Sequence, residues 1–287
     1  MTRRAVGGGA GIWSLVILMA LIGFSSSLTK EQPIFEGLVV FGDSLSDMGN
    51  AGRFSDGPVW VEQLADKLEL PLKPSELGGQ NFAVGGARIE AGPQCLREQV
   101  DRFLKLPRRS GRALYVVWGG ANDIFASLGQ PDALSQLDAA AASLKTILSD
   151  LIRHGASDLL VPNIPNVSIT PEVRAKGSDA VDEAGRLTDH FNRAVEGHLT
   201  YLASSVPGLR LYRFDVAAMA ERARKDPLSF GFTDISTPCR EAARCGDYVF
   251  WDEIHPTTAA HARLAEAAAA AISTQQWTDH AKLGRPT

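Results

Sequence analysis

The sequence predicts an α/β fold, a three-layer α/β/α sandwich in which helices cover both faces of a mainly parallel sheet. Two short apolar runs, residues 37–41 and 113–118, are rich in valine and aromatic residues, and a glycine follows each. Apolar runs that are continuous, not alternating, are typical of parallel strands buried on both faces. Stretches with helical periodicity separate the runs, and this alternation favours a doubly wound sheet.

The expected elements follow one another in a regular order. The predicted strands are 37–41, 113–118, 158–161 and 209–214, and the predicted helices are 59–68, 132–153, 182–205 and 256–272. In sheets of this kind, binding groups gather in the loops beyond the carboxyl ends of the strands. We therefore expect the chemistry of the protein in those loops.

Composition and charge limit the functions to consider. The chain has 287 residues, of which 45% are hydrophobic and 22% charged, as expected for a folded globular protein. Lys and Arg together number 29 against 33 Asp and Glu, so no excess of positive charge is available to neutralise phosphates. We expect no nucleic acid partner. No linker or repeat divides residues 35–275, which favours one domain.

The N-terminus has the features of a secretory signal peptide, which we assign to residues 1–27. Arg3 and Arg4 precede residues 12–24, where only one side chain is polar, and small residues follow. A permanent membrane helix is the weaker alternative, because spanning a bilayer takes about 20 apolar residues. The arginine pair also allows a twin-arginine route. We expect a secreted or periplasmic protein with no stable membrane span after cleavage.

The three cysteines agree with export. Cys239 and Cys245 lie six residues apart in a loop-like stretch, where an oxidising compartment would let them form a disulfide. A metal site is less favoured, because no further Cys or His lies nearby at ligand spacing. Cys95 is left over and is expected to be either a buried, inert side chain or a free thiol.

The first expected strand is followed directly by the segment GDSLSDMGN, residues 42–50. A serine at a strand-to-helix turn, such as Ser44, is exposed beside unpaired backbone N–H groups and suits a nucleophile. The alternative is a serine that only caps a tight turn. The segment is not the G-x-S-x-G elbow of another hydrolase class, because position 46 is Ser.

A candidate base lies near the C-terminus. Asp252 and His255 are three residues apart before an alanine-rich helix, so the carboxylate can accept the Nδ1–H of the imidazole and leave Nε2 free. Glu253 is the rival carboxylate, although its side chain points away from the imidazole in most turn geometries. A solvated loop in which Asp252 caps a turn is the alternative reading.

Two further segments offer hydrogen-bond donors. Asn122, after the second predicted strand, can direct its side-chain NH₂ at a developing negative oxygen. Gly86 follows a short predicted strand at 81–84, and an exposed N–H there would be another donor. Ordinary turn chemistry explains both segments as well.

Together the four segments resemble the SGNH hydrolases, also called the GDSL esterase/lipase family. The family's blocks match, in the family's order, VVFGDSLSDMGN at 39–50, NFAVGGA at 81–87, GGAND at 119–123 and DEIHPT at 252–257. GFTD at 231–234 also looks like the stretch before the last block in larger members. The resemblance implies a flavodoxin-like sheet and a hydrolase domain over residues 28–287.

The resemblance also implies roles for individual residues. Ser44 would be the nucleophile, His255 its base and Asp252 the residue that orients His255, which are the roles expected from the residues alone. The Ser44 N–H, the Gly86 N–H and the Asn122 side chain would form the oxyanion hole. An ester would be cleaved through an acyl-enzyme intermediate, with no metal or organic cofactor.

The substrate is open at this point. A small-molecule or lipid ester is expected, a carbohydrate O-acetyl esterase is the main enzymatic rival, and a non-catalytic binding module is the rival from another class. We expect a monomer. The loops at 54–60, 93–97, 165–176 and 227–247 are the candidates for selecting the substrate. Aromatic or apolar residues there that favour an acyl chain or an aromatic alcohol are Phe54, Trp60, Ile169, Phe230, Phe232 and Tyr248.

Overall fold

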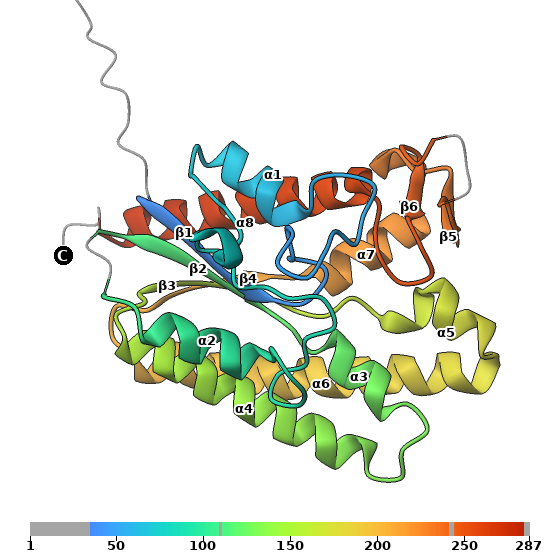
Figure 1. Ribbon diagram of the computed structural model, residues 1–287, viewed down its shortest axis with the longest axis horizontal. Coiled ribbons are helices and arrows are strands. Elements are labelled where there is room, and N and C mark those ends of the chain that lie inside the picture. Colours follow the sequence, from blue (N-terminus) through green and yellow to red (C-terminus); the bar gives the residue numbers. More distant parts are fainter. Residues whose placement is uncertain (1–34, 109–110, 241–243, 284–287) are drawn as a thin grey trace, which may run out of the picture. The chain divides into compact units, whose positions relative to one another are not determined.

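The computed structural model describes residues 35–108, 111–240 and 244–283 of the chain. These residues belong to one compact unit (Figure 1). The predicted signal peptide, residues 1–27, lies outside the described residues. None of the helices in the described ranges combines the length and apolar character that a membrane span requires.

The central sheet has four parallel strands in the order β1–β2–β3–β4. They are β1 (Gly37–Gly42), β2 (Ala113–Trp118), β3 (Asp158–Pro162) and β4 (Arg210–Phe214). Every residue of β1, β2 and β3 is buried, which is why their apolar runs are continuous. All four predicted strands are confirmed, with ends shifted by no more than one residue.

The segment at 80–84 extends the sheet beyond β1 without forming a regular strand. The Val40 N–H donates to the Gln80 carbonyl oxygen at 2.9 Å, and the Phe82 N–H donates to the Val40 carbonyl oxygen at 2.7 Å. The pairing is parallel but amounts to an isolated bridge, so the predicted strand at 81–84 is only partly formed. If this segment is counted as a strand, it is the second strand along the chain. The order of the five strands across the sheet is then 2-1-3-4-5, the flavodoxin-like order.

Helices cover both faces of the sheet (Figure 1). Helices α1 and α8 pack together on one face, and α2, α4 and α6 lie on the other. The helices are α1 (Trp60–Lys67), α2 (Leu96–Leu104), α3 (Ala121–Ser127), α4 (Ala133–Arg153), α5 (Pro171–Ala175), α6 (Ser178–Ser205), α7 (Val216–Lys225) and α8 (Thr258–Leu283). The predicted three-layer α/β/α sandwich is confirmed.

The predicted helices at 59–68, 132–153, 182–205 and 256–272 correspond to α1, α4, α6 and α8. The sequence pattern missed α2, α3, α5 and α7, which have ten residues or fewer. Short helices present little periodicity, and their stability comes from packing against the sheet and its loops. Helix α8 runs eleven residues further than expected, because its alanine-rich sequence has no breaker before residue 283.

Trp60 belongs to the core and not to a substrate loop. Its side chain is fully buried, and its ring lies edge-on to Trp118 with the ring centroids 5.4 Å apart. The expectation that Trp60 helps to select the substrate is therefore wrong. A tryptophan at the start of a buried helix face contributes its large apolar area to the core instead.

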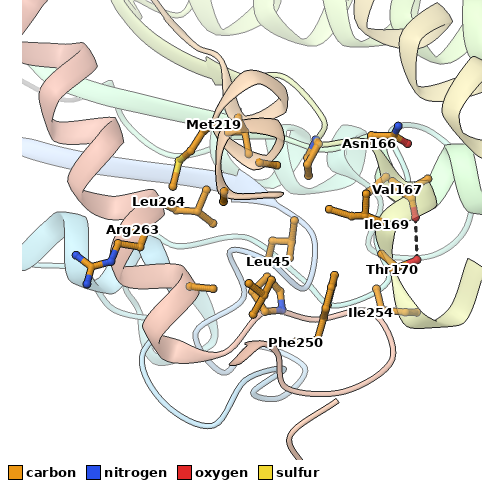
Figure 2. Close-up of a pocket in the computed structure, with 18 of the residues that line it drawn as sticks. Leu45, Asn166, Val167, Ile169, Thr170, Met219, Phe250, Ile254, Arg263 and Leu264 are labelled. Carbon is orange, nitrogen blue, oxygen red and sulfur yellow. Dashed lines mark hydrogen bonds between the residues drawn. The ribbon is translucent and has the colours of Figure 1, made fainter. Parts of the chain in front are cut away.

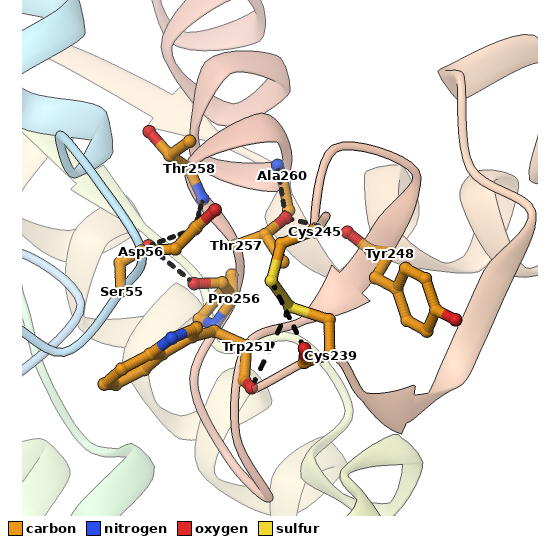
Figure 3. Close-up of a disulfide and its surroundings, with 10 residues drawn as sticks. All are labelled: Ser55, Asp56, Cys239, Cys245, Tyr248, Trp251, Pro256, Thr257, Thr258 and Ala260. Carbon is orange, nitrogen blue, oxygen red and sulfur yellow. Dashed lines mark hydrogen bonds between the residues drawn. A yellow bond between two sulfur atoms is a disulfide. The ribbon is translucent and has the colours of Figure 1, made fainter. Parts of the chain in front are cut away.

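A second, two-stranded parallel sheet lies between α7 and α8 in the sequence: β5 (Asp234–Pro238) and β6 (Tyr248–Phe250). The predicted disulfide joins Cys239 to Cys245 in the connection between these strands (Figure 3). Cys95 is a free cysteine and is buried, the first of the two alternatives considered for it.

Candidate active site

Ser44 lies in a tight turn directly after β1. The Asp43 carbonyl oxygen accepts the Ser46 N–H at 3.0 Å and so closes the turn. Gly42 makes the turn possible, because a Cβ at that position would lie 2.8 Å from the Trp118 carbonyl oxygen. The backbone thus holds Ser44 at the carboxyl end of the sheet, where β1 and β2 lie side by side and the strand order reverses.

The structure brings Ser44, His255 and Asp252 together in one hydrogen-bonded chain. The Nε2 atom of His255 lies 3.0 Å from the Ser44 Oγ atom. On the other side of the ring, Nδ1 lies 2.8 Å from Oδ2 and 3.0 Å from Oδ1 of Asp252. The geometry fits a serine that gives its proton to an imidazole oriented by a carboxylate.

The carboxylate of Asp252 is held in its ionised form. Burial by itself would raise the pKa of Asp252, but hydrogen bonds from the His255 ring and from the N–H groups of His255 and Ile254 lower it below the usual value. The two backbone bonds reach Oδ1 at 2.6 and 2.9 Å. The same carboxylate therefore orients the imidazole and fixes the loop that carries it.

Glu253 has a different environment. Its side chain is exposed, and its carbonyl oxygen accepts the Glu172 N–H at 3.0 Å, which ties the loop to α5. Among the carboxylates of the described residues, Asp252 alone lies within hydrogen-bond distance of the His255 ring.

The predicted oxyanion hole has three N–H donors, the backbone N–H groups of Ser44 and Gly86 and the Asn122 side chain. Within the described part of the chain, no residue accepts the backbone N–H of Ser44 or of Gly86. Asn122 donates one side-chain N–H to the Ala87 carbonyl oxygen at 3.0 Å and keeps a second N–H for a ligand. Free donors of this kind can stabilise an oxyanion.

The chemistry of the site is that of acyl transfer. The Ser44 hydroxyl follows β1, Asp252 and His255 share the loop between β6 and α8, and Asn122 lies in the first turn of α3. Among the described residues, no group of three or more His, Cys, Asp or Glu side chains is arranged to hold a metal ion.

An apolar pocket of about 150 Å³ opens beside Ser44 (Figure 2). Side chains from α7, α8, β6 and the segment at 165–170 line it together with Leu45. The predicted substrate-selecting residues that line it are Ile169, Phe230 and Phe232, and those that do not are Phe54, Trp60 and Tyr248.

The family model described as GDSL-like Lipase/Acylhydrolase matches residues 38–268. The chain belongs to this family. The match includes Ser44 and extends past His255, and it makes the chain a carboxylic ester hydrolase.

The chain is similar to proteins from bacteria and plants. The chain is 25% identical to the phosphatidylcholine-sterol acyltransferase of Aeromonas hydrophila, a match that covers 91% of this chain and 97% of the relative. It is also 25% identical to Lipase 1 of Photorhabdus luminescens, over 86% of this chain and 52% of the relative. GDSL esterase/lipase 5 of Arabidopsis thaliana is 26% identical, over 77% of this chain and 78% of the relative.

Solved structures share the fold. An acetylxylan esterase from Geobacillus stearothermophilus superposes with a TM-score of 0.53 at 18% identity, over 84% of this chain and 96% of the esterase. A lipolytic protein of the G-D-S-L family from Veillonella parvula gives a TM-score of 0.51 at 14% identity, over 83% of this chain and 98% of that protein. At this identity the similarity supports the fold and not the substrate.

The sequence analysis missed the residue that joins two loops of the site, Asp47. One carboxylate oxygen accepts the N–H groups of Gly49 and Asn50, and the other accepts those of Ala51 and Gly85, at 2.7 to 3.1 Å. Asp47 is fully buried, so these bonds replace water. The signal was present, since Asp47 lies in the first motif, but a pairing with residue 85 depends on the fold.

A second link joins α3 to the same loop. The Asp123 carboxylate accepts the Ile89 N–H at 3.0 Å and pairs with Arg88 at 3.4 Å. Asp123 directly follows Asn122, so these contacts hold the loop after Gly86 beside the helix that carries the Asn122 side chain. The sequence predicted that the Asn122-Asp123 pair forms a turn or that Asn122 is an oxyanion donor, and it predicted no role for Asp123.

Phe54 contacts the site through His255 and not through the pocket. The centroid of its ring lies 5.2 Å from that of the imidazole, at an angle of 36°. Gly85 leaves the space for Phe54, because a Cβ at Gly85 would lie 2.2 Å from the Phe54 ring. The Phe54 ring therefore packs against the imidazole.

Asp43 is the acidic residue of the pocket lining. Burial raises the pKa of Asp43 to about 7, while the hydrogen bond from the Leu45 N–H lowers it by less. The side chain is 3% exposed, and the Leu45 N–H lies 3.0 Å from Oδ1. A carboxyl group that resists ionisation indicates a region of low polarity beside Ser44.

Proposed function

We propose that this GDSL family hydrolase cleaves carboxylic esters in two steps, with Ser44 as the nucleophile, His255 as the base and Asp252 as the residue that orients the imidazole. The observation that carries the proposal is the continuous hydrogen-bonded chain from the Ser44 Oγ through His255 to Asp252, with distances of 3.0 and 2.8 Å. The matching motif order of the family supports it.

In the first step, the Ser44 Oγ attacks the ester carbonyl carbon as its proton moves to Nε2 of His255. The bond between carbon and Oγ forms, and the carbonyl oxygen becomes an oxyanion. The N–H groups of Ser44, Gly86 and Asn122 donate to that oxygen. Asp252 stabilises the positive charge that develops on the imidazole, because its carboxylate stays ionised.

The intermediate collapses when His255 returns its proton to the alcohol oxygen, so the alcohol leaves and an acyl group stays on Ser44. A water molecule then gives a proton to His255 and attacks the acyl carbon. The same three donors stabilise the second oxyanion, and the carboxylic acid leaves as Ser44 regains its proton. Side chains and backbone N–H groups of this chain, with one water molecule, supply every group that these steps use.

We propose that the enzyme acts outside the cytoplasm, secreted or periplasmic, after removal of residues 1–27. The charged and apolar order of the N-terminal residues supports export. The Cys239–Cys245 disulfide supports it as well, because such bonds persist in oxidising compartments. We propose that the active form is a monomer, since one chain supplies all groups of the site.

The test compares secreted wild type and Ser44→Ala on p-nitrophenyl acetate, p-nitrophenyl butyrate and acetylated xylan. We expect wild type to hydrolyse the p-nitrophenyl esters and the variant to have lost that activity with its thermal unfolding unchanged. Release of acetate from xylan at a higher rate than from the p-nitrophenyl esters would instead indicate a carbohydrate O-acetyl esterase. Absence of hydrolysis on all three substrates contradicts the proposed function.

A further inference from the structure

We infer that the pocket beside Ser44 binds the acyl chain of a medium-length aliphatic ester, with α7 and α8 on its two sides, and that Ala220 and Ala223 set the length of chain it accepts. The inference rests on the proposed function, because it requires the acyl group to be attached to Ser44. It goes beyond that function by naming the substrate class and the residues that select it.

The pocket begins at the proposed reaction centre. Ser44 and Asn122 belong to its lining, so a carbonyl group held by them projects its acyl chain into this space. Phe54, which contacts His255, does not line the pocket. We therefore assign the pocket to the acyl side of the ester and leave the side of Phe54 to the alcohol.

One wall is a single face of α7. Val216, Met219, Ala220 and Ala223 recur at the spacing that places side chains on the same side of a helix, and all four line the pocket. Met219 is buried, and the two alanines are small enough to leave space in front of the helix. Any larger side chain at Ala220 or Ala223 would enter the pocket.

Another part of the lining comes from α8 and from the segment before β5. Ala260 and Leu264 belong to α8, and Phe230 and Phe232 add aromatic surface (Figure 2 shows Leu264 and Met219 near one another). Arg263 also lines the pocket, but its guanidinium group donates to the Phe230 carbonyl oxygen and pairs with Glu266. Its charge is thus compensated.

Two polar groups of the lining at 165–170 are bound within the protein. The Thr170 hydroxyl donates to the Val167 carbonyl oxygen at 2.8 Å, and the Asn166 side-chain oxygen accepts the Ser168 N–H at 3.0 Å (Figure 2 shows the first of these bonds). A sugar bound against the apolar side chains of the lining would lose hydrogen bonds to water, which is costly. An aliphatic chain meets no such cost.

The volume of the pocket sets the length of the acyl chain that fits it. A dry apolar cavity of about 150 Å³ is large enough to hold benzene, so the pocket accommodates about six carbon atoms beyond the carbonyl region, and acyl groups of about six to eight carbons should fit best. An acetyl group would leave most of this apolar surface in contact with water. The structure therefore favours hexanoyl and octanoyl esters over acetyl esters.

The experiment measures kcat/KM of the secreted enzyme on p-nitrophenyl esters from acetyl to palmitoyl. We expect kcat/KM to rise about fourfold per added methylene, the value for transferring one methylene from water, until about six to eight carbons, and then to stop rising. Equal kcat/KM for acetate and octanoate would overturn the inference and leave ester hydrolysis in place. Absence of hydrolysis of every ester, acetate included, would overturn the proposed function itself.

Two variants test whether the acyl chain of the substrate lies against α7. Ala220→Phe and Ala223→Phe fill the pocket, so each should lower the ratio of octanoate to acetate kcat/KM at least about tenfold. Ala142→Phe is the matched control: Ala142 is exposed on α4, far from the pocket lining, and its variant should keep the wild-type ratio. The same loss of ratio in Ala142→Phe, or an unchanged ratio in both α7 variants, would overturn the inference.

Met219→Ala keeps the inference testable where a phenylalanine variant fails to fold. Removing the Met219 side chain lengthens the pocket on the α7 side, so the chain length of highest kcat/KM should move up by two or more carbons. An optimum that stays where it is in wild type would contradict the assignment of the acyl chain to the α7 wall. Circular dichroism and thermal unfolding of each variant establish that it is folded.

Discussion

Asn122 offers one free N–H to the proposed oxyanion hole, because its other N–H is bound to the Ala87 carbonyl oxygen. Asn122→Ala removes that donor from the transition state and leaves the Ser44 proton transfer intact. We expect kcat to fall by about 10² to 10³, equivalent to about 3 to 4 kcal/mol, with little change in KM. Steady-state kinetics on p-nitrophenyl hexanoate measures both parameters.

A loss of tenfold or less would show that Asn122 serves only to bind Ala87. Since the bond to Ala87 also disappears in the alanine variant, the thermal unfolding of Asn122→Ala is the control. An unfolding temperature close to that of wild type assigns the lost rate to the missing donor.

The pairing of His255 with Asp252 has its own test. His255 carries a positive charge once it has accepted the Ser44 proton, and the Asp252 carboxylate stabilises that charge. Asp252→Asn keeps the shape of the side chain but removes its negative charge. We expect kcat/KM on p-nitrophenyl hexanoate to fall by about 10² to 10⁴.

Glu253→Gln is the matched control, because Glu253 is adjacent to Asp252 and exposed. Its activity should equal that of wild type. The reverse result, a crippled Glu253→Gln and a nearly active Asp252→Asn, would assign the orienting role to the neighbour and refute the pairing.

The site residues that the sequence predicted and those that it missed differ in how far along the sequence their partners lie. Asp252 and His255 could be paired from sequence because they are three residues apart in one turn. Asp47 and Phe54 could not, because their partners, Gly85 and His255, are distant in the chain. Motif spacing reports local contacts, and long-range packing appears only in the fold.

At the scale of elements, the loop between β5 and β6 supports the segment that carries Asp252 and His255. The Cys239 N–H donates to the Phe250 carbonyl oxygen at 2.9 Å, and the Thr257 hydroxyl donates to the Tyr248 carbonyl oxygen at 2.7 Å (Figure 3 shows the second of these bonds). These two bonds fix β6 on both sides. The disulfide closes the connection immediately before it.

We expect the double variant Cys239→Ser, Cys245→Ser to lose about 2 kcal/mol of unfolding free energy, the loop-entropy value for so short a ring. For a chain of this size the unfolding temperature should fall by about 4 to 8 °C. Calorimetry with and without a reductant measures the effect. Wild type should lose stability when reduced, whereas the double variant should not respond; equal unfolding temperatures of wild type and variant would contradict the role of the disulfide.

Helix α7 shows what the sequence pattern could not reveal at this scale. Its outward residues are charged, so a ten-residue stretch with one apolar face is hard to distinguish from a loop. The pocket in front of Ala220 and Ala223 exists because α7 faces α8, which is a tertiary relation. Strands β1, β2 and β3 were predictable because strands that are buried on both faces consist largely of consecutive apolar residues.

For the molecule as a whole, two buried carboxyl groups act on stability in opposite directions. Burial alone would raise the pKa of Asp158, but hydrogen bonds from Arg210 and Arg112 hold it far below the usual value, so its stabilisation is lost as the pH falls below about 4. Asp43 has its pKa raised from 3.8 to about 7, so between these values the folded state holds a proton that the unfolded state has released. The contribution of Asp43 to stability should therefore fall as the pH rises through that window.

Burial lowers the pKa of His261 from 6.5 to about 3, so stability is lost as the pH falls through that range, which opposes the effect of Asp43. Asp43→Asn removes the titrating group and keeps an acceptor for the Leu45 N–H. Its unfolding free energy, compared with that of wild type, should gain about 2 to 4 kcal/mol more at pH 8 than at pH 4. Calorimetry over a pH series checks this, and parallel curves for the two proteins would show that Asp43 does not titrate in this window.

The central claim is that Ser44 is the nucleophile, and covalent labelling tests it most directly. A fluorophosphonate reacts with an activated serine, so the wild-type enzyme should lose activity as one label per chain attaches, and peptide mass spectrometry should place that label on Ser44. Ser44→Ala should remain unlabelled, with kcat lower by about 10⁵ to 10⁶ and unchanged unfolding. Stoichiometric labelling at another serine, or labelling of Ser44→Ala, would contradict the account.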